Sequence, residues 1–406
     1  MSQAPDQILT GFRLLDFTRA LAGPTCTRLF AELGADVIKI ESAPSGDMTR
    51  RISKIRNERS LYFVQQSLNK KSVCVDLRKP EGMALIKELV KECDVVVENF
   101  KPGVMAEMGI DYQTLKNIKP DIILCSISAL GQSGPLATKP GYDYIAQAYS
   151  GVTSMIGDPN DAPMIPLVGV GDVMTGVHGA FAVAAALLYR QRTGEGKHID
   201  IGLVDSYYHC HEVNVHQYSA TNGAINPTRA GRHVAYVCPA GVYRATGGNI
   251  MLMGFLHHWA DLCRAMARTD LIDHENFKDD PSRLKHFPEV LEQIETWLKT
   301  FPDVSSAVTH LEKFNVPCAP ILSVEETTKH PHLLARGTVR TINDPVAGEF
   351  QIPGMPIKFI GSEANQDFVA PTLGQHNSDV LRDLLGKSEV EIKQLEASGV
   401  LFAREV

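Results

Sequence analysis

Short hydrophobic runs alternate with amphipathic stretches through the first half of the 406-residue chain. The first group comprises an apolar run at 12–18, an amphipathic stretch at 25–33 and a second apolar run at 36–41. A strand, a helix and a strand within about 30 residues form a βαβ unit, and the strands of such a unit pair in parallel. The beginning of the chain therefore predicts the start of a parallel sheet.

The same alternation continues to about residue 200. Further strands are predicted at 72–77, 94–100, 121–128 and 198–203, and helices at 80–92 and 180–190. The run DVVVENF at 94–100 is almost continuously apolar, which is typical of a strand buried on both faces. This pattern predicts an α/β fold with a doubly wound, Rossmann-like large domain.

The pattern changes after residue 224. Two short apolar runs flank Gly247-Gly248 and predict a hairpin, and a helical region follows. Later elements are the helical region at 281–314, a second hairpin-like pair at 338–342 and 349–352, and two helices within 378–398. We expect a large domain of residues 1–224, completed by 331–406, and a smaller α+β domain of residues 225–330.

Composition and charge exclude several classes of protein. Hydrophobic residues make up 44% of the chain and charged residues 21%, as in ordinary globular proteins. The formal net charge of -7 argues against a nucleic-acid or anionic-membrane partner, either of which needs a basic surface. The longest apolar run, 177–189, is too short to span a bilayer. The first residues lack a basic segment followed by an apolar one, so we expect a cytoplasmic protein.

Several familiar binding and catalytic sites do not fit the sequence. The first βα turn reads TRALAGP at 18–24, and neither the dinucleotide-binding GxGxxG nor the phosphate-binding GxxxxGK[ST] occurs there. His211 and His216 are five residues apart, whereas a zinc-protease helix needs a spacing of four. The eight cysteines contain no CxxC pair, which excludes a zinc ribbon and a thioredoxin-type site. No metal site is expected.

Asp172 is the strongest candidate for chemistry. It follows Gly171 and stands immediately before the predicted Ala-rich helix. One interpretation is an N-cap, whose carboxylate accepts hydrogen bonds from the first free backbone N–H groups. The other is an ionised nucleophile that attacks an activated carbonyl, with glycines allowing the ligand to approach closely. The spacing alone leaves both open.

Several short motifs follow one another along nearly the whole chain. They are LLDFT at 14–18, AGP at 22–24, LGADVIKIE at 33–41, GD at 46–47, NKKS at 69–72, DLR at 76–78, VENFKPG at 97–103, YD at 142–143, GD at 171–172 and GQH at 374–376. The ordered set resembles the class III CoA-transferases, the family of formyl-CoA, carnitine-CoA and acetyl-CoA:oxalate transferases. This resemblance implies a Rossmann-like fold and a homodimer of interlocked rings.

The resemblance also implies a mechanism. Asp172 would attack the donor thioester to give a mixed anhydride, and the released CoA would then form an enzyme–CoA thioester. An acceptor carboxylate would finally receive the CoA. Coenzyme A and acyl-CoA thus enter as substrates, with a small carboxylate or dicarboxylate as acceptor, and no permanently bound cofactor is implied.

The remaining site residues come from the same resemblance. It implies CoA contacts for Arg78, Asn99, Phe100, Lys139 and Arg19, and a substrate pocket that includes Leu21, Tyr62 and Tyr142. Arg19 is also available to meet a second carboxylate of the acceptor. Arg19 and Leu21 replace the His and Gln of the formyl-CoA branch, and Glu107 stands where a relative has a basic residue. These departures weaken the expectation of formyl and oxalate specificity.

Two alternatives remain. An α-methylacyl-CoA racemase shares the fold, but it uses a Gly-His-Asp motif where this chain has Gly141-Tyr142-Asp143. Without that His, the pair of proton-transfer groups that a racemase needs is incomplete. A non-catalytic subunit of a hetero-oligomeric CoA-transferase is the second alternative, and the presence of Asp172 argues against it.

Overall fold

The computed structural model describes residues 7–255, 257–361 and 368–404, and it separates into two compact units. Unit 1 comprises Met1–Val152, Pro166–Glu212 and His332–Val406, and unit 2 comprises Thr153–Ile165 and Val213–Pro331. The chain therefore leaves unit 1 twice, after Val152 and after Glu212, whereas the sequence suggested one departure at residue 224. The sequence of residues 153–165 has no hydrophobic pattern that would indicate a separate unit.

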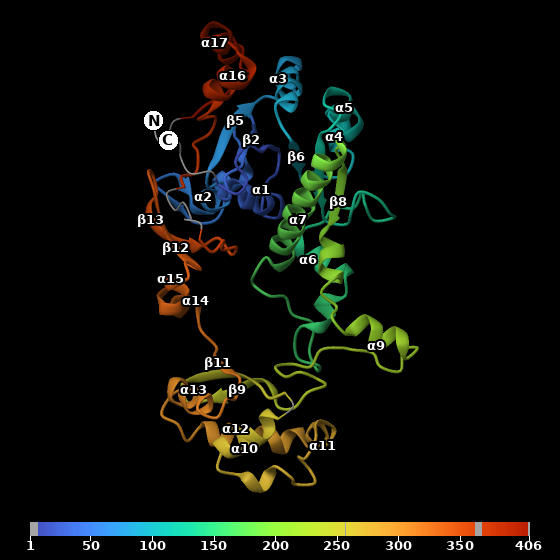
Figure 1. The fold of residues 1–406 in the computed structure, drawn as a ribbon, viewed down its shortest axis with the longest axis vertical. Helices are drawn as coiled ribbons and strands as arrows, with labels where there is room; N and C mark the ends of the chain where they lie inside the picture. The colour runs from blue at the N-terminus through green and yellow to red at the C-terminus, as the bar shows by residue number, and fades with distance from the viewer. Residues whose placement is uncertain (1–6, 256, 362–367, 405–406) are drawn as a thin grey trace. The chain divides into compact units, whose positions relative to one another are not determined.

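Unit 1 is built on a six-stranded parallel sheet (Figure 1). In spatial order its strands are β5 (Lys70–Val75), β2 (Asp36–Ser42), β1 (Arg13–Asp16), β6 (Val95–Glu98), β7 (Ile123–Ser128) and β8 (His198–Gly202). The chain begins at the centre, moves outward through β2 and β5, and then continues from β6 on the other side of β1. The order therefore reverses between β1 and β6, as in a doubly wound sheet. The predicted α/β fold with a parallel sheet is confirmed.

The helices of unit 1 follow the strands along the chain. They are α1 (Ala22–Glu32), α2 (Leu61–Gln66), α3 (Pro80–Lys91), α4 (Val104–Glu107), α5 (Tyr112–Ile118), α6 (Asp143–Tyr149), α7 (Val170–Thr193), α8 (Leu203–Tyr208), α16 (Asn377–Leu385) and α17 (Glu389–Ala397). A 3-10 turn, Met48–Arg51, and the short strand pair β3 (Ile55–Arg56) and β4 (Arg59–Ser60) precede α2.

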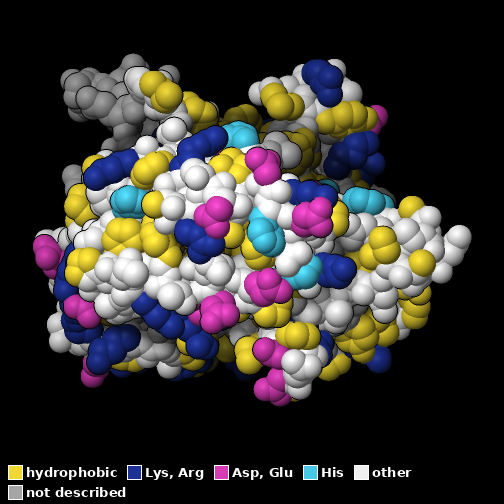
Figure 2. Space-filling view, turned by 90° about the horizontal axis from the view of Figure 1, so that it is seen from below, with side chains coloured by type: hydrophobic (Ala, Val, Ile, Leu, Met, Phe, Trp, Pro, Cys, Tyr) yellow, Lys and Arg dark blue, Asp and Glu magenta, His cyan; other side chains and the backbone are white. Residues whose placement is uncertain are grey.

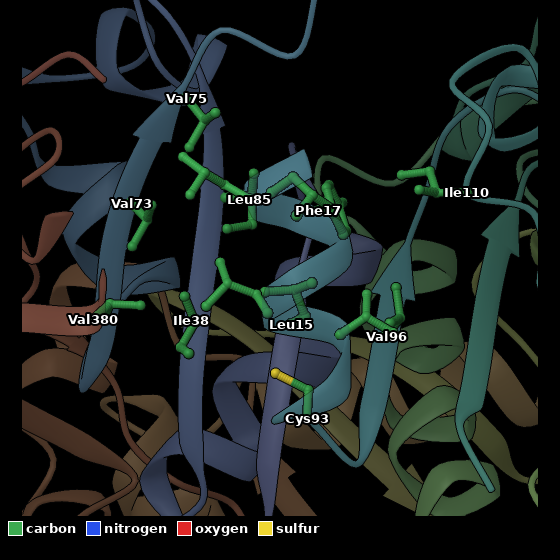
Figure 3. Close-up of a cluster of buried hydrophobic side chains, with 14 of the residues drawn as sticks. Leu15, Phe17, Ile38, Val73, Val75, Leu85, Cys93, Val96, Ile110 and Val380 are labelled. Carbon is green, nitrogen blue, oxygen red and sulfur yellow. The ribbon is translucent and has the colours of Figure 1, made fainter. Parts of the chain in front are cut away.

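Both faces of the sheet are buried because successive side chains of a strand point to opposite sides. On one face, Leu15 of β1 and Val96 of β6 pack with Leu85 of α3 and Val380 of α16 (Figure 3). On the other face, Leu14 of β1 lies in a second cluster with residues of α1 and α7. Two covered faces explain why the strands read as continuous apolar runs rather than alternating ones.

Helix α7 is longer than the sequence predicted. The Ala-rich run suggested a helix at 180–190, but α7 begins at Val170 and extends for 24 residues. A Cβ on Gly176 would lie 2.5 Å from the carbonyl oxygen of Ala22, so this glycine allows α7 to lie directly against α1. Among the described residues, α7 is the one helix long and apolar enough to cross a membrane by length and composition. Its contacts with α1 and with the sheet bury part of this apolar surface in unit 1.

The C-terminal part of unit 1 forms the predicted hairpin and two helices. Strands β12 (Val339–Asp344) and β13 (Gly348–Pro353) pair antiparallel, and α16 and α17 follow. Arg340 of β12 is paired with buried Glu32 of α1 at 2.7 Å. This segment thus packs onto elements formed more than 300 residues earlier in the chain.

Unit 2 contains a three-stranded antiparallel sheet with helices. The sheet consists of β11 (Cys318–Pro320), β10 (Gly248–Met253) and β9 (Ala240–Ala245), in that order. Its helices are α9 (Asn214–Ala220), α10 (His258–Ala265), α11 (Asp280–Lys285), α12 (Phe287–Leu298), α13 (Val304–Glu312) and α14 (Val324–Lys329), and α15 (Pro331–Ala335) leads back to unit 1. The predicted hairpin around Gly247-Gly248 is confirmed. Tyr243, Trp259 and Leu298 lie in a shared core of this unit.

The surface carries both signs of charge. On the face seen in Figure 2, basic and acidic side chains alternate with hydrophobic ones and with several histidines. This mixture agrees with the modest net charge of the whole chain.

Candidate active site

The sheet reverses its strand order between β1 and β6, and ligands of open parallel sheets bind outside the carboxyl ends of the strands at such a point. The segments that leave these two strands are joined to each other. The backbone N–H of Arg19 donates to Oδ1 of Asn99 at 2.9 Å, and Nδ2 of Asn99 donates to the Arg19 carbonyl at 2.7 Å. The Arg19 guanidinium lies 5.0 Å from the centre of the Phe100 ring. Three of the expected site residues therefore lie together.

Asp172 lies in the first turn of α7. The N-cap of the helix is Gly169, so the interpretation of Asp172 as an N-cap is wrong. The helix begins earlier than predicted, because packing against α1 stabilises a glycine-containing turn that propensity alone disfavours. A carboxylate in a first turn is stabilised by the positive end of the helix dipole.

Burial and the neighbouring Asp143 raise the pKa of Asp172 to about 7. Asp143 belongs to the first turn of α6, and its carboxylate accepts a hydrogen bond from the Asp172 N–H at 3.4 Å. The raised pKa places the ionisation of Asp172 near neutral pH. A carboxylate of higher pKa is also a better nucleophile and base than an ordinary one.

Tyr207 holds the starts of α6 and α7 together. Its hydroxyl donates to Asp143 and accepts from the Gly171 N–H at 3.0 Å and from Nε2 of Gln147 at 3.1 Å. Burial raises the pKa of Tyr207, so the hydroxyl remains a donor. A Cβ on Gly171 would lie 2.0 Å from the Tyr207 ring, and only glycine leaves room for this contact.

Two expected pocket residues lie close to Asp172. A Cβ on Gly169 would lie 2.6 Å from Cδ2 of Leu21 and 4.0 Å from Cβ of Asp172, which places the Leu21 side chain at the start of α7. Burial raises the pKa of Tyr62 to about 12, and the negative charge of Asp172 contributes to that shift. The structure therefore brings Leu21, Tyr62 and Asp172 to one place.

The other expected residues have separate partners. Tyr142 is the N-cap of α6 and is 78% exposed, beside Asp143 in sequence. Arg78 follows β5, and its side chain, 79% exposed, contacts Asp76 through two nitrogens at 2.8 Å. Those hydrogen bonds lower the pKa of Asp76 to about 2. Nζ of Lys139 lies 3.5 Å from the hydroxyl of Tyr149.

The fold and the site together define a class of protein. It is an α/β protein in which a carboxylate with a pKa near neutrality lies beside the loops at the reversal point of a parallel sheet. The sequence profile of CoA-transferase family III matches residues 9–377, and the chain belongs to that family. The protein is accordingly a CoA-transferase, whose family uses CoA thioesters as substrates.

Similar proteins match nearly the whole chain. A formyl-CoA:oxalate CoA-transferase of Rhodopseudomonas palustris (strain BisA53) is 32% identical, with 97% of each chain covered. A succinyl-CoA–D-citramalate CoA-transferase of Chloroflexus aurantiacus is also 32% identical, covering 98% of this chain and 100% of its own. The crystal structure of a CaiB/BaiF family protein from Brucella suis matches 93% of this chain and 100% of its own with a TM-score of 0.82 and 30% identity. The family resemblance suggested by the motifs is confirmed.

Sequence reasoning missed several residues that shape the site. Asp143 was noted only as part of a motif, although a polar residue next to Tyr142 in that motif was a usable signal. Tyr207 is buried and lies in an unremarkable stretch after β8, so nothing in the sequence marks its contact with Gly171. Lys39 had a clear signal, because a lysine in the otherwise apolar DVIKIE run is buried only when it has charged partners.

Proposed function

We propose that this protein transfers CoA from an acyl-CoA donor to a small carboxylate through covalent intermediates on Asp172. The observation that carries the proposal is the position of Asp172, beside Leu21 and Tyr62, with a pKa of about 7. About half of such carboxyl groups are ionised at neutral pH, so a nucleophile is available without a separate base.

The reaction exchanges acyl bonds and involves no oxidation. A carboxylate oxygen of Asp172 attacks the thioester carbonyl carbon, the C–S bond breaks, and CoA leaves as a thiolate, so that a mixed anhydride of Asp172 and the donor acid remains. The thiolate then attacks the side-chain carbonyl carbon of Asp172 and releases the donor acid as its carboxylate. The acceptor carboxylate attacks the resulting aspartyl thioester, the C–S bond breaks, and a second mixed anhydride forms between Asp172 and the acceptor. The released CoA thiolate attacks the acceptor carbonyl carbon of this anhydride, which gives the new acyl-CoA and frees the Asp172 carboxylate. Anhydride and thioester both hydrolyse, so the partial burial of Asp172 protects them.

The CoA moiety is assigned to the carboxyl edge of the sheet. Arg78 and Lys139 would bind its phosphates, since both are exposed cations. The segment that contains Asn99 and Phe100 would lie along the pantetheine and adenine. Arg19 would lie between CoA and the acceptor, because its guanidinium is stacked on Phe100 while its backbone leads to Leu21.

The proposed acceptor is a short dicarboxylate. Two similar enzymes are named for oxalate and for D-citramalate, both of which carry two carboxylates. Arg19 supplies a cation for the second carboxylate, in the position where the resemblance gives the formyl-CoA branch a His. An Arg19→Gln variant should lose more activity with dicarboxylate than with monocarboxylate acceptors, and equal losses would contradict this assignment.

The protein is also proposed to be a homodimer. Val173, Val177, Phe181 and Leu188 form an apolar stripe on α7 whose members are 41–75% exposed. The stripe follows the helical repeat, and a second copy of the chain would bury it. Light scattering after size-exclusion chromatography should give twice the chain mass, and a Phe181→Glu variant should shift the protein toward monomer.

Intact-protein mass spectrometry tests the chemistry directly. The protein would be mixed with succinyl-CoA, acetyl-CoA or formyl-CoA and compared with Asp172→Asn and with Asp379→Asn, a surface carboxylate of α16. We expect a CoA-sized adduct on the wild type and on Asp379→Asn but not on Asp172→Asn. An adduct that persists in Asp172→Asn would refute the assigned nucleophile. Exchange of the α-proton of a branched acyl-CoA without any adduct would instead support the racemase alternative.

A further inference from the structure

The segment that follows β1 is held through its backbone by three side chains from different elements. The carbonyls of Thr18–Ala20 each accept one hydrogen bond, in order from Nζ of Lys39 at 2.6 Å, from Nδ2 of Asn99 at 2.7 Å and from the hydroxyl of Tyr62 at 3.3 Å. Lys39 belongs to β2, Asn99 follows β6 and Tyr62 belongs to α2. A loop whose consecutive carbonyls all have side-chain partners has little freedom to move.

The amide groups of the same segment are also bound. The Thr18 N–H donates to Oδ1 of Asp16 at 2.8 Å, and the Arg19 N–H donates to Oδ1 of Asn99 at 2.9 Å. Asn99 therefore uses both ends of its side-chain amide on one peptide neighbour, Arg19. One N–H and one lone pair of that amide remain, and the two bonds to Arg19 fix the orientation of the group.

Two buried ion pairs adjoin the segment that follows β1. Lys39 is 1% exposed and forms an ion pair with Asp47 at 2.8 Å, and Asp16 is fully buried and paired with Lys70 at 3.0 Å. Burial acts to lower the pKa of Lys39, but Asp47 and Asp16 raise it above its usual value, so the ammonium stays charged. The proposed chemistry gives Lys39 no role, whereas its hydrogen bond to the Thr18 carbonyl gives this buried charge a structural one.

Ala20 shows why such support is required. Its φ is +65°, in the left-handed region that residues with a Cβ rarely adopt. Conformations of this kind persist where the surrounding structure over-determines them, and they gather at functional sites. The next residue is Leu21, which packs against Gly169 beside Asp172.

We propose that the segment Thr18–Leu21 is a preformed, rigid wall of the acyl site, and that Lys39, Asn99 and Tyr62 are positioning residues that hold it. The proposal rests on the proposed function of Asp172 and adds a positioning role that the proposed chemistry does not assign to these three side chains. Asn99, in particular, becomes a clamp on the wall rather than a ligand of CoA through its side chain.

A rigid wall has a measurable consequence for the reaction. The acyl carbonyl must lie within attacking distance of Asp172, and misplacement by about 1 Å costs on the order of 100-fold in rate. Loss of the clamp should therefore slow formation of the Asp172 adduct at saturating acyl-CoA, while the affinity for CoA changes little. Loss of a direct CoA ligand would instead weaken the affinity for CoA and leave the rate at saturation nearly unchanged.

Asn377 offers a matched control for Asn99. Its side chain also makes two hydrogen bonds to the backbone in unit 1, accepting from the Cys74 N–H at 2.9 Å and donating to the Phe402 carbonyl at 3.1 Å. Asn99→Ala and Asn377→Ala would be compared for the Kd of CoA, the rate of adduct formation at saturation and thermal stability. We expect both to lose stability, and only Asn99→Ala to lose about tenfold or more in rate with less than a threefold change in Kd.

Hydrogen–deuterium exchange provides a readout that does not depend on the chemistry. Amides of the peptide covering 17–23 should exchange faster in Asn99→Ala than in the wild type or in Asn377→Ala. Tyr62→Phe should weaken the same wall, so its rate effect should be non-additive with that of Asn99→Ala.

Three outcomes would overturn the proposal. They are unchanged exchange at 17–23 in Asn99→Ala, an Asn99→Ala variant with an unchanged saturating rate and a raised Kd, and equal rate losses in both alanine variants. If the wild type forms no adduct with any donor, the proposed function fails, while the exchange experiment still decides whether the wall is rigid.

Discussion

The carboxylate of Asp143 accepts a hydrogen bond from the backbone N–H of Asp172, and this contact places two acidic side chains at the starts of two helices. The Tyr207 hydroxyl completes the arrangement by binding Asp143 and the Gly171 N–H. Asp143 is thereby held in place, and its charge adds to burial in raising the pKa of Asp172. The electrostatic environment of the proposed nucleophile is therefore set by neighbours that the polypeptide brings from distant positions.

Replacing Asp143 should shift the pH dependence of the reaction. Wild-type adduct formation should rise with pH around an apparent pKa of about 7, as Asp172 ionises. Asp143→Asn removes a negative neighbour, which favours the charged form of Asp172, so the rising limb should move to lower pH. Burial is the larger cause of the raised pKa and remains in this variant, so the apparent pKa of the rising limb should stay above the ordinary value for an aspartate. Single-turnover rates between pH 5 and 8 would measure the shift, and a limb that stays in place or moves upward would contradict it.

Asp172→Asn should abolish adduct formation and make the protein more stable. The folded pKa of about 7 exceeds the ordinary value of 3.8, so the stability associated with protonated Asp172 is present at low pH and is lost as pH rises toward 7. Above pH 7, the ionised Asp172 lowers the free energy of unfolding by on the order of 2 kcal/mol, after allowance for solvent screening. Denaturant unfolding at pH 5 and pH 8 should show a larger gain for Asp172→Asn at pH 8. A loss of stability at both pH values would refute this account.

Gly171→Ala should disrupt the start of α7. The new Cβ would overlap the Tyr207 ring, whose position is fixed by three hydrogen bonds. Gly179→Ala is the control within the same helix, because its Cβ would meet the Ile127 and Cys26 side chains at 3.2–3.6 Å rather than overlap an aromatic ring. We expect Gly171→Ala to lose about 2 kcal/mol or more of stability and most of the activity, and Gly179→Ala to change stability by less than about 1 kcal/mol. Equal effects of the two variants would argue against a special role for the Tyr207 contact.

Arg78→Ala should weaken acyl-CoA binding without slowing the chemical steps. A phosphate of CoA would compete with Asp76 for the exposed guanidinium, and one lost charge-assisted contact corresponds to about a tenfold rise in KM with little change in kcat. The effect should shrink at high salt, since exposed charges are screened. Arg382→Ala on α16 is the control, because Arg382 is also exposed and paired with an aspartate, Asp379, at 2.6 Å. A fall in kcat for Arg78→Ala, or a matching rise in KM for Arg382→Ala, would remove Arg78 from the CoA site.

Local pattern was sufficient to predict much of unit 1. The runs at 12–18, 94–100 and 121–128 are apolar because their strands are buried on both faces, and this property is visible in any single strand. The hairpin at Gly247-Gly248 and the helices within 378–398 were likewise predicted from turn residues and periodicity. The family could be predicted because its motifs lie in fixed order along the chain.

Helix α7 shows where local pattern failed. Residues 170–179 contain glycines that disfavour a helix, yet they are helical because those glycines fit against Tyr207, Ala22 and Cys26. The early start moves Asp172 from the expected cap into the first turn. Only contacts between elements decided this, and a local propensity scale does not include them.

The sequence by itself determined the order of strands and helices, the family and the candidate residues, because these depend on residue type and on spacing along the chain. Tertiary structure decided which of those residues meet. It placed Asp143 and Tyr207 beside Asp172, and it directed Lys39, Asn99 and Tyr62 to three successive carbonyls after β1. Such contacts join positions up to 80 residues apart, and their energies depend on distance and burial in space, which no local pattern records.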